Sequence, residues 1–258
     1  MPLQVITPPA VEPVTLTEFK DHLRITHADE DDILALYLKA ARQYAETTLC
    51  WRAFIEQELE MSYDRFPRYF RLPRAPLQSV TSIIYRLRDG TLETIAPADY
   101  IVDTDSEPGR IVPAVDERWP SDSLYPLNAV RVLYAAGYPT YYGTVDTVNT
   151  TRAVTRTAGD EFNVDWPAGQ PIVINGVLYH IANVATTDLL TVTTAPGDQT
   201  GVAYSAHEVP EEIRQGILLL AGHFYQVREP VIIGTSVLQV PFTVEALLLP
   251  FRVWGADV

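Results

Sequence analysis

The chain has 258 residues, 47% of them hydrophobic and 20% charged, which is typical of a globular protein that is long enough for one large domain or two small ones. Its formal net charge of −14 argues against tight sequence-independent binding to nucleic acid, because such binding relies on basic groups that displace counterions from phosphates. The single cysteine, Cys50, excludes an internal disulfide framework, and we expect it to be a small buried side chain in a reducing cytoplasm. No apolar run is long enough to span a bilayer, and the first residues lack the basic and apolar regions of a signal peptide.

Two helices are predicted near the N-terminus. Thr15–Glu18 has the pattern of a capping box, which predicts a short helix over residues 14–25. The acidic run Asp29–Asp32 favours the positive end of a helix dipole, so a longer helix is predicted from Asp31 to Leu49. Adjacent carboxylates on a first turn point in different directions, which makes capping a better interpretation than a metal site. The side chains expected to be buried on this helix are Ile33, Leu36, Tyr37, Ala40, Ala41, Tyr44 and Ala45.

Short strands are predicted next. Ala53–Tyr63 alternates between apolar and polar residues, and Asp89-Gly90 predicts a hairpin turn between a strand at Val80–Leu87 and a return toward Ile95. Further short strands are predicted at Tyr100–Val102, Arg110–Val112 and Val130–Tyr134.

The composition changes after Tyr138. Residues 144–207 are rich in threonine and valine and show no helical periodicity. Asn175-Gly176 predicts the tip of a hairpin within Pro171–Val184, and Leu189–Thr194 supplies another strand. These residues are therefore expected to form a compact antiparallel barrel or sandwich.

A third helix is predicted at Pro210–Val227. Pro210 suits a first-turn position, Glu211 and Glu212 favour the positive end of the dipole, and Pro230 should end the helix. Its apolar face is formed by Ile213, Ile217, Leu220, Phe224 and Val227.

Residue patterns that carry chemistry are missing. The histidines have no metal-ligand spacing; they are His22, His27, His180, His207 and His223. Asp103–Glu107 resembles the start of a calcium loop, but Pro108 takes the place of the required glycine and Ala114 that of the last ligand. The sequence has no phosphate-binding glycine loop and no nucleophile elbow. We therefore expect no enzyme, no metal and no cofactor.

Four segments in this order resemble the head-tail connector (adaptor) proteins of tailed bacteriophages. The segments are RLPRAPLQSVTSIIY at 71–85, ADYIVDTDSEPGRIV at 98–112, AVRVLYAAGY at 129–138 and VPEEIRQGILLLAGHFYQVREP at 209–230. In that family the strand that matches Val130–Tyr134 is followed almost directly by the helix that matches Pro210–Val227. The resemblance thus implies that residues 144–207 are an inserted β-module, and that residues 1–143 and 208–258 form the connector core.

The resemblance implies an α+β fold, in which a small helical bundle with packed short strands carries an inserted all-β barrel or sandwich module. It also implies a virion structural protein that is made in the host cytoplasm and forms a twelve-fold ring in the neck. The implied partners are the portal protein, a head-closure or tail-terminator protein and further copies of the chain, without a membrane. Double-stranded DNA would pass through the ring without sequence-specific binding. An acidic channel lining would suit that passage, although acidity is also ordinary for soluble bacterial proteins.

The C-terminal segment is the candidate portal-docking site. Family members dock this end on the portal, and the matching residues here are Phe251, Arg252, Val253 and Trp254. They follow a short helix that Thr243 is expected to cap, at Val244–Leu249. Aromatic and arginine side chains are the usual anchors of protein interfaces. The alternative is that Phe251 and Trp254 fold back on their own bundle.

A rival function comes from a different class. The chain would be a carbohydrate- or surface-binding accessory virion protein that acts through its β-module. The candidate aromatics for such a surface are Phe162, Trp166, Tyr179 and Tyr204, although such residues more often form the core of a small β-module. An exposed aromatic row would favour this function, and buried aromatics would not.

Overall fold

The computed structural model describes residues 2–227 and 242–254. By their contacts, the residues divide into two compact units. The first comprises Met1–Val14, His27–Tyr138 and Val209–Val258, and the second comprises Thr15–Thr26 and Pro139–Glu208. Each unit is described by itself below.

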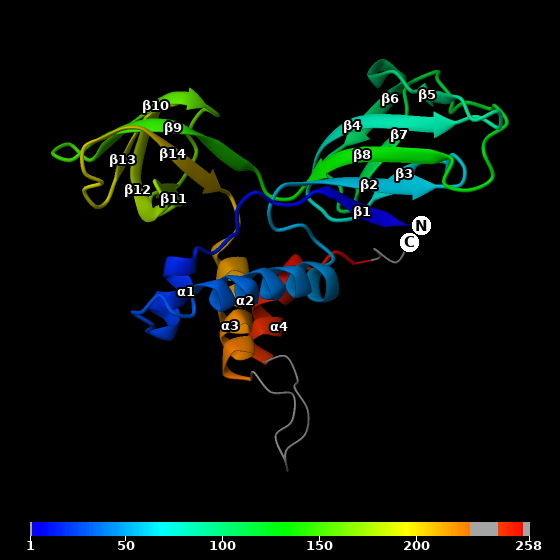
Figure 1. Cartoon of the computed structure of the whole chain (residues 1–258). Helices are drawn as coiled ribbons and strands as arrows, with labels where there is room; N and C mark the ends of the chain where they lie inside the picture. The colour runs from blue at the N-terminus through cyan, green and yellow to red at the C-terminus, as the bar shows by residue number, and fades with distance from the viewer. Residues whose placement is uncertain (1, 228–241, 255–258) are drawn as a thin grey trace, which may run out of the picture. The chain divides into compact units, whose positions relative to one another are not determined.

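Two antiparallel sheets form the β-part of the first unit (Figure 1). The larger has the order β1-β2-β8-β4-β5 and consists of Leu3–Thr7, Gln57–Tyr63, Val130–Ala136, Leu77–Arg86 and Leu92–Thr94 in that order. The smaller has the order β3-β7-β6 and consists of Phe70–Leu72, Gly109–Pro113 and Tyr100–Asp103. One apolar core contains side chains of both sheets, including Met61, Phe70 and Ile111. At its centre Tyr134 is fully buried, and its hydroxyl donates a hydrogen bond to the Pro73 carbonyl over 2.9 Å.

The predicted strands of this unit are confirmed, with adjusted ends. The strand predicted from Ala53 begins at Gln57, and the Asp89-Gly90 turn joins β4 to β5 with Gly90 at a φ of 97°. Strands β1 and β3 were not predicted. The first is an exposed edge strand and the second has only three residues, so neither shows a periodic apolar pattern.

All predicted helices are present. Helix α1 spans Leu16–Leu23, and the predicted capping box holds it: the Glu18 amide donates to Thr15 Oγ1 over 3.2 Å, and the Thr15 amide donates to Glu18 Oε2 over 2.8 Å. Helix α2 spans Asp31–Tyr44 and continues as a π-helix, η1, over Ala45–Cys50. The last helices are α3 at Glu211–Gln226, α4 at Phe242–Leu248 and the 3-10 turn η3 at Leu249–Phe251. Pro230, the predicted stop of α3, lies outside the described residues.

The predicted buried face of α2 was confirmed at Ala41 and Ala45 and wrong in the first turns of the helix. Ile33 and Leu36 are 38% and 58% exposed, whereas Leu34 and Leu38 are buried. The buried residues recur as Leu34, Leu38, Ala41, Arg42, Ala45 and Glu46. Two of them, Arg42 and Glu46, are charged. A prediction that considers only apolar residues therefore omits them and selects residues on a neighbouring face of the helix.

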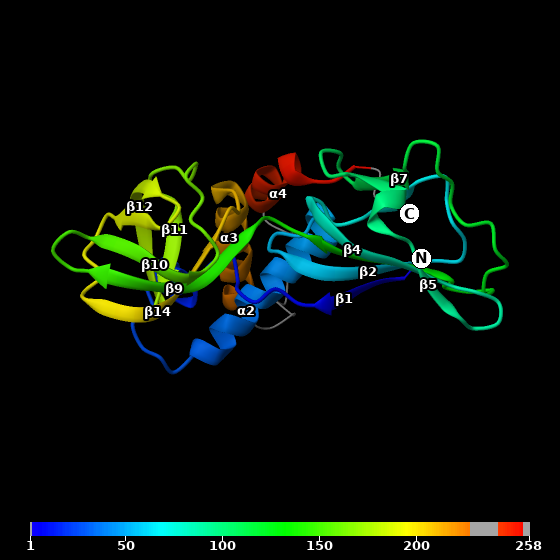
Figure 2. The same cartoon turned by 90° about the horizontal axis from the view of Figure 1, so that it is seen from above.

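The second unit contains a closed barrel of six antiparallel strands, in the order β10-β13-β12-β11-β14-β9 (Figure 2). In chain order the strands are β9 Thr140–Val148, β10 Ala153–Gly159, β11 Pro171–Ile174, β12 Val177–Thr186, β13 Leu189–Val192 and β14 Gln199–His207. The predicted Asn175-Gly176 hairpin is confirmed, and both residues have the positive φ that such a two-residue turn needs, 49° and 77°. The α+β fold with a β-barrel module is thus present, and the barrel begins at Thr140 rather than Thr144.

Candidate docking surfaces

A buried ionic network fixes helix α2 in the first unit. Arg42 is 3% exposed, and it donates to Glu12 over 2.6 Å through Nε and to Glu46 over 2.8 Å through Nη1. The other carboxylate oxygen of Glu46 accepts the Phe54 amide over 2.8 Å. These contacts tie the N-terminal segment, the helix and the chain that leads into β2 to one another.

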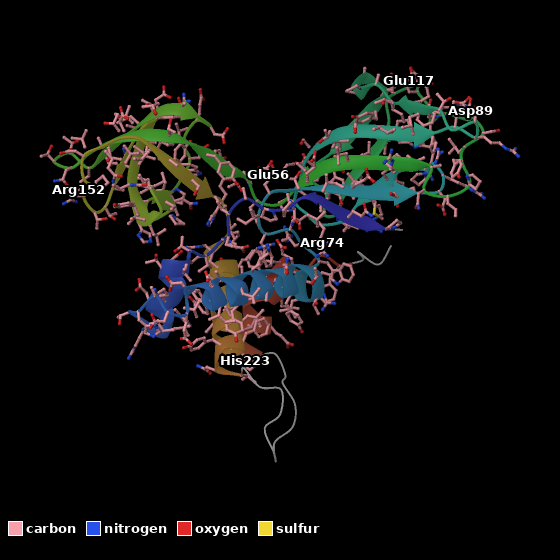
Figure 3. All side chains as sticks on the ribbon, viewed as in Figure 1. Glu56, Arg74, Asp89, Glu117, Arg152 and His223 are labelled. Atoms are coloured by element: carbon pink, nitrogen blue, oxygen red, sulfur yellow. The ribbon has the colours of Figure 1, made fainter. Side chains whose placement is uncertain are left out.

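The same network reaches the turn between β3 and β4. Arg74, which is labelled in Figure 3, donates through Nη1 to the carbonyl oxygen of Glu46 in η1. Burial raises the pKa of Glu46 above its usual value, while the charges of Arg42 and Arg74 and the Phe54 amide act in the opposite direction. The free-energy cost of burying this carboxylate is therefore offset only while Arg42, Arg74 and the Phe54 amide are in place.

The C-terminal segment is partly attached to the end of η1 and to the residue that follows Arg74. Val253 is 4% exposed, packs on Ala75, and donates its amide to the Cys50 carbonyl over 2.9 Å. The carbonyl of Phe251 accepts Arg52 Nε over 2.8 Å. Of the two residues in the fold-back alternative, Phe251 is thus attached through its backbone; Val253, which that alternative did not name, is the buried side chain.

The remaining two predicted docking residues face solvent. Trp254 is 68% exposed, and the Arg252 guanidinium lies over its ring at 4.8 Å from the centroid. Helix α4 and η3 add Phe242 and Leu249, which are 81% and 54% exposed. Buried Leu248 of α4 packs on Gly216 of α3, so this short helix has one attached face and one exposed apolar face. Exposed aromatic and arginine side chains beside an anchored backbone are the usual elements of an interface. Residues 255–258 lie outside the described part of the chain.

Cys50 is buried, as expected. Its thiol lies 3.5 Å from the Leu248 carbonyl, and burial raises its pKa to about 12. The thiol therefore stays protonated at neutral pH, which fits a packing role.

The barrel aromatics lie in its core. Phe162, Trp166 and Tyr204 are 1%, 6% and 3% exposed, and Tyr179 is partly buried against the same cluster. These three residues therefore have the core role that the sequence favoured, and the alternative of an exposed ligand platform does not apply to them. The sequence alone could not decide between the two arrangements, because strand alternation is interrupted in the loop that carries Phe162 and Trp166.

The Glu208 carboxylate, directly after the last barrel strand, accepts three hydrogen bonds from residues of the same unit. Glu208 Oε1 accepts hydrogen bonds from Tyr141 Oη at 2.8 Å, Asn163 Nδ2 at 2.7 Å and Trp166 Nε1 at 3.0 Å. The Glu208 amide donates to the Pro139 carbonyl over 3.1 Å. The two chain segments that enter and leave the barrel are thus hydrogen-bonded to each other.

Ionisable side chains form no metal site in the described part of the chain. Within residues 2–227 and 242–254, no group of three or more His, Cys, Asp or Glu residues is arranged to hold a metal ion. In the same residues, none of the helices has the length and apolarity that crossing a membrane requires. Asp103, the first residue of the rejected calcium loop, instead accepts hydrogen bonds from Ser106 and Arg110.

Known proteins resemble this chain in part of its sequence and in its fold. Residues 13–89 match the model of the phage gp6-like head-tail connector protein family. Two solved structures share the fold over 98% of this chain and 96% of theirs: a chain from the virion of a native gene transfer agent (GTA) particle, with 19% identity and a TM-score of 0.58, and one from the neck of an empty GTA particle computed with C6 symmetry, with 20% identity and a TM-score of 0.57. A third, from the neck of a native GTA particle computed with C12 symmetry, has 18% identity and a TM-score of 0.57 over the same shares. A comparison with curated proteins finds no match. The shared fold includes the barrel, since so little of the chain is left uncovered.

Proposed function

We propose that this chain, whose residues 13–89 carry a phage gp6-like head-tail connector domain, is a structural adaptor in the neck of a tailed phage or a phage-like particle. The observation that carries the proposal is the fold shared over 98% of the chain with proteins of the GTA virion and neck. The connector match covers the first two helices and strands β2–β4, and the structural likeness extends it to the rest. The role is structural rather than enzymatic.

The assembly that we propose is a twelve-membered ring below the portal. Support comes from the C12 symmetry of one neck structure with the same fold. Each contact in such a ring joins two different faces of the same protein. The ring would link the portal to a head-closure or tail-terminator protein, and DNA would pass through it without sequence-specific contacts. A net charge of −14 would limit its adhesion to the channel wall.

The rival function, a carbohydrate- or surface-binding accessory protein, is not favoured. It requires aromatic side chains on the outside of the barrel, and Phe162, Trp166 and Tyr204 are buried. Their hydroxyl and indole groups bond to Asp160 and Glu208 of the same unit.

The adaptor role is tested by making particles without the chain. We expect DNA-filled heads that lack tails, and restoration of tailed particles when the wild-type chain is supplied, both visible by negative-stain electron microscopy. Normal tailed particles in its absence would refute the adaptor role.

Portal docking is proposed for the exposed pair, Arg252 and Trp254. We expect Arg252→Ala/Trp254→Ala to remove binding to the purified portal while shifting the melting temperature by less than about 2 °C, because neither side chain is buried. Pull-down and thermal melting would measure the two effects. Val253→Ala is the matched control, since it should lose about 1–2 kcal/mol of stability and keep portal binding. Portal binding by the double variant would contradict the proposal.

Residues 144–207 are proposed to be an insertion in the connector core. Support comes from the hydrogen bond between Glu208 and Pro139, which brings the ends of the barrel segment together. In the test variant, a short glycine-serine linker replaces residues 140–207. We expect this variant to unfold in one cooperative transition, because a short surface linker costs little free energy to close. Circular dichroism during urea denaturation is the measurement. A non-cooperative transition would show that the barrel is needed by the rest of the fold.

A further inference from the structure

Four arginines lie on the small sheet or in the loop that leads into its strand β3. We call them the arginine patch, defined as Arg65, Arg68, Arg71 and Arg110. The first two are exposed in the loop between β2 and β3, and Arg71 on β3 lies directly opposite Arg110 on β7. The neighbours of the last two, Phe70, Leu72, Gly109 and Ile111, are buried, so both arginines belong to the outer face.

This pairing is unfavourable within a single chain. Like charges directly opposite on neighbouring strands destabilise a sheet. Asp103 offsets one of them, because it accepts Arg110 Nε over 3.0 Å, and hydrogen bonds from Ser106 and Arg110 lower its pKa to about 2. No ion pair joins Arg65, Arg68 or Arg71 to any residue of the described ranges. Within residues 2–227 and 242–254, these three arginines thus have no ion pair with a carboxylate, although the chain has 33 acidic residues.

The densest acidic stretch lies at the far end of helix α2. Asp29–Asp32 are four consecutive carboxylates; the side chain of Asp29 is 91% exposed, and Asp32 is exposed as well. Arg74, three residues after Arg71, donates a hydrogen bond to the Glu46 carbonyl in η1, which continues the other end of the same helix. At 1.5 Å per residue, Asp32 and Glu46 are separated by about 20 Å. The acidic run is therefore at the opposite end of the helix from the Arg74 attachment.

We propose that the arginine patch of one copy docks on the acidic run Asp29–Asp32 of a second copy. The proposal rests on the adaptor function, because a ring needs a contact between two different faces of the chain. Copies with a net charge of −14 repel one another, and a local pair of opposite charges at the contact orients them and offsets that repulsion. Two exposed apolar side chains of α2, Ile33 and Leu36, lie next to the acidic run in the sequence. The same contact would cover them.

A charge exchange between two variants tests the contact. The first variant is Arg65→Glu/Arg68→Glu and the second is Asp29→Lys/Asp32→Lys, both in the full chain. Each alone should self-associate roughly tenfold more weakly than the wild type at low salt, because several charge pairs become repulsive. Their equimolar mixture should regain association, since the reversed patch of one fits the reversed run of the other. Sedimentation equilibrium measures the weight-average mass.

A third variant separates this contact from general charge effects. Arg24→Glu/Arg88→Glu carries the same charge change at two exposed arginines outside the patch. Its mixture with the Asp29→Lys/Asp32→Lys variant should gain no mass. If Asp32→Lys unfolds the helix, Asp29→Lys alone takes its place, because Asp29 precedes the first helical turn. A mixture of the two exchanged variants that is no heavier than either variant alone overturns the proposal.

Duplex DNA is the other polyanion that an arginine patch could bind. Fluorescence anisotropy with a short labelled duplex covers this outcome. If Arg65→Glu/Arg68→Glu removes DNA binding and leaves the mass of the protein unchanged, the patch faces phosphates and the docking proposal is wrong. These measurements use the purified chain alone. Their failure is therefore distinct from failure of the adaptor role, which is judged on particles.

Discussion

Replacing Arg42 by methionine is expected to lower the free energy of unfolding by about 3–5 kcal/mol, because it leaves Glu46 charged and buried without its main partner. Glu12 also loses both of its hydrogen bonds to the guanidinium. Urea denaturation followed by circular dichroism measures the change. Arg110→Met is the matched control: its ion pair with Asp103 is half exposed, and its loss should cost less than about 1 kcal/mol.

The pH dependence of this loss identifies its cause. In the Arg42→Met variant the Glu46 carboxyl keeps its burial and loses an opposing charge, so its pKa in the folded state rises further above the unfolded value. A carboxyl with a raised pKa binds its proton more tightly in the folded state, which gains stability as the pH falls and loses it as the pH rises through the folded pKa. The difference between variant and wild type should therefore be smaller at about pH 5 than at about pH 8. Equal differences at both values would show that lost packing, not the buried charge, causes the effect. Arg42→Met/Glu46→Gln should recover part of the stability at the higher pH.

Gly137→Ala is expected to cost about 3 kcal/mol or more, because both backbone strain and contact oppose a side chain there. Gly137 has a φ of 123°, and a Cβ at this position would lie 2.3 Å from the Ile55 carbonyl oxygen. The Gly137 amide donates a hydrogen bond to the Pro76 carbonyl, and the Gly137 carbonyl accepts one from Gln78 Nε2, each over 2.9 Å. The backbone therefore cannot move away without losing hydrogen bonds.

A second glycine serves as its control. Gly176→Ala shares the positive φ, at 77°, but no atom lies within 4 Å of the added carbon, so the cost should be about 1 kcal/mol. Thermal and urea denaturation of both variants give the comparison. A similar cost at the two glycines would show that the close approach to Ile55 does not matter.

The elements with strong local patterns were predictable from the sequence. The capping box at Thr15 and the Asn175-Gly176 turn depend on residues close in the chain, and both are present with the expected geometry. The buried face of α2 was not predictable in the same way. Arg42 and Glu46 are buried only because Glu12 and Phe54, distant in sequence, supply their partners. Apolar periodicity contains no information on such partners.

The candidate site was predictable in composition and not in orientation. The four residues Phe251–Trp254 looked equivalent as anchors, but the structure buries Val253 and exposes Trp254. Which of them faces inward depends on Cys50 and Ala75, about two hundred residues earlier in the chain. The barrel aromatics were open to two interpretations for the same reason, since only the closed strand order buries them.

The π-helical end of α2 affects how related sequences should be aligned. Over Ala45–Cys50 the backbone closes its hydrogen bonds across one residue more than an α-helix does. A relative whose helix ends in a regular turn would therefore be one residue shorter at this point. Alignments that forbid gaps inside helices would then shift every following position by one residue. Trp51 of this chain would be paired with the relative's counterpart of Arg52, the residue that binds Glu107 and the Phe251 carbonyl. A one-residue gap placed within 45–50 restores the correspondence, and comparative models of such relatives should include it.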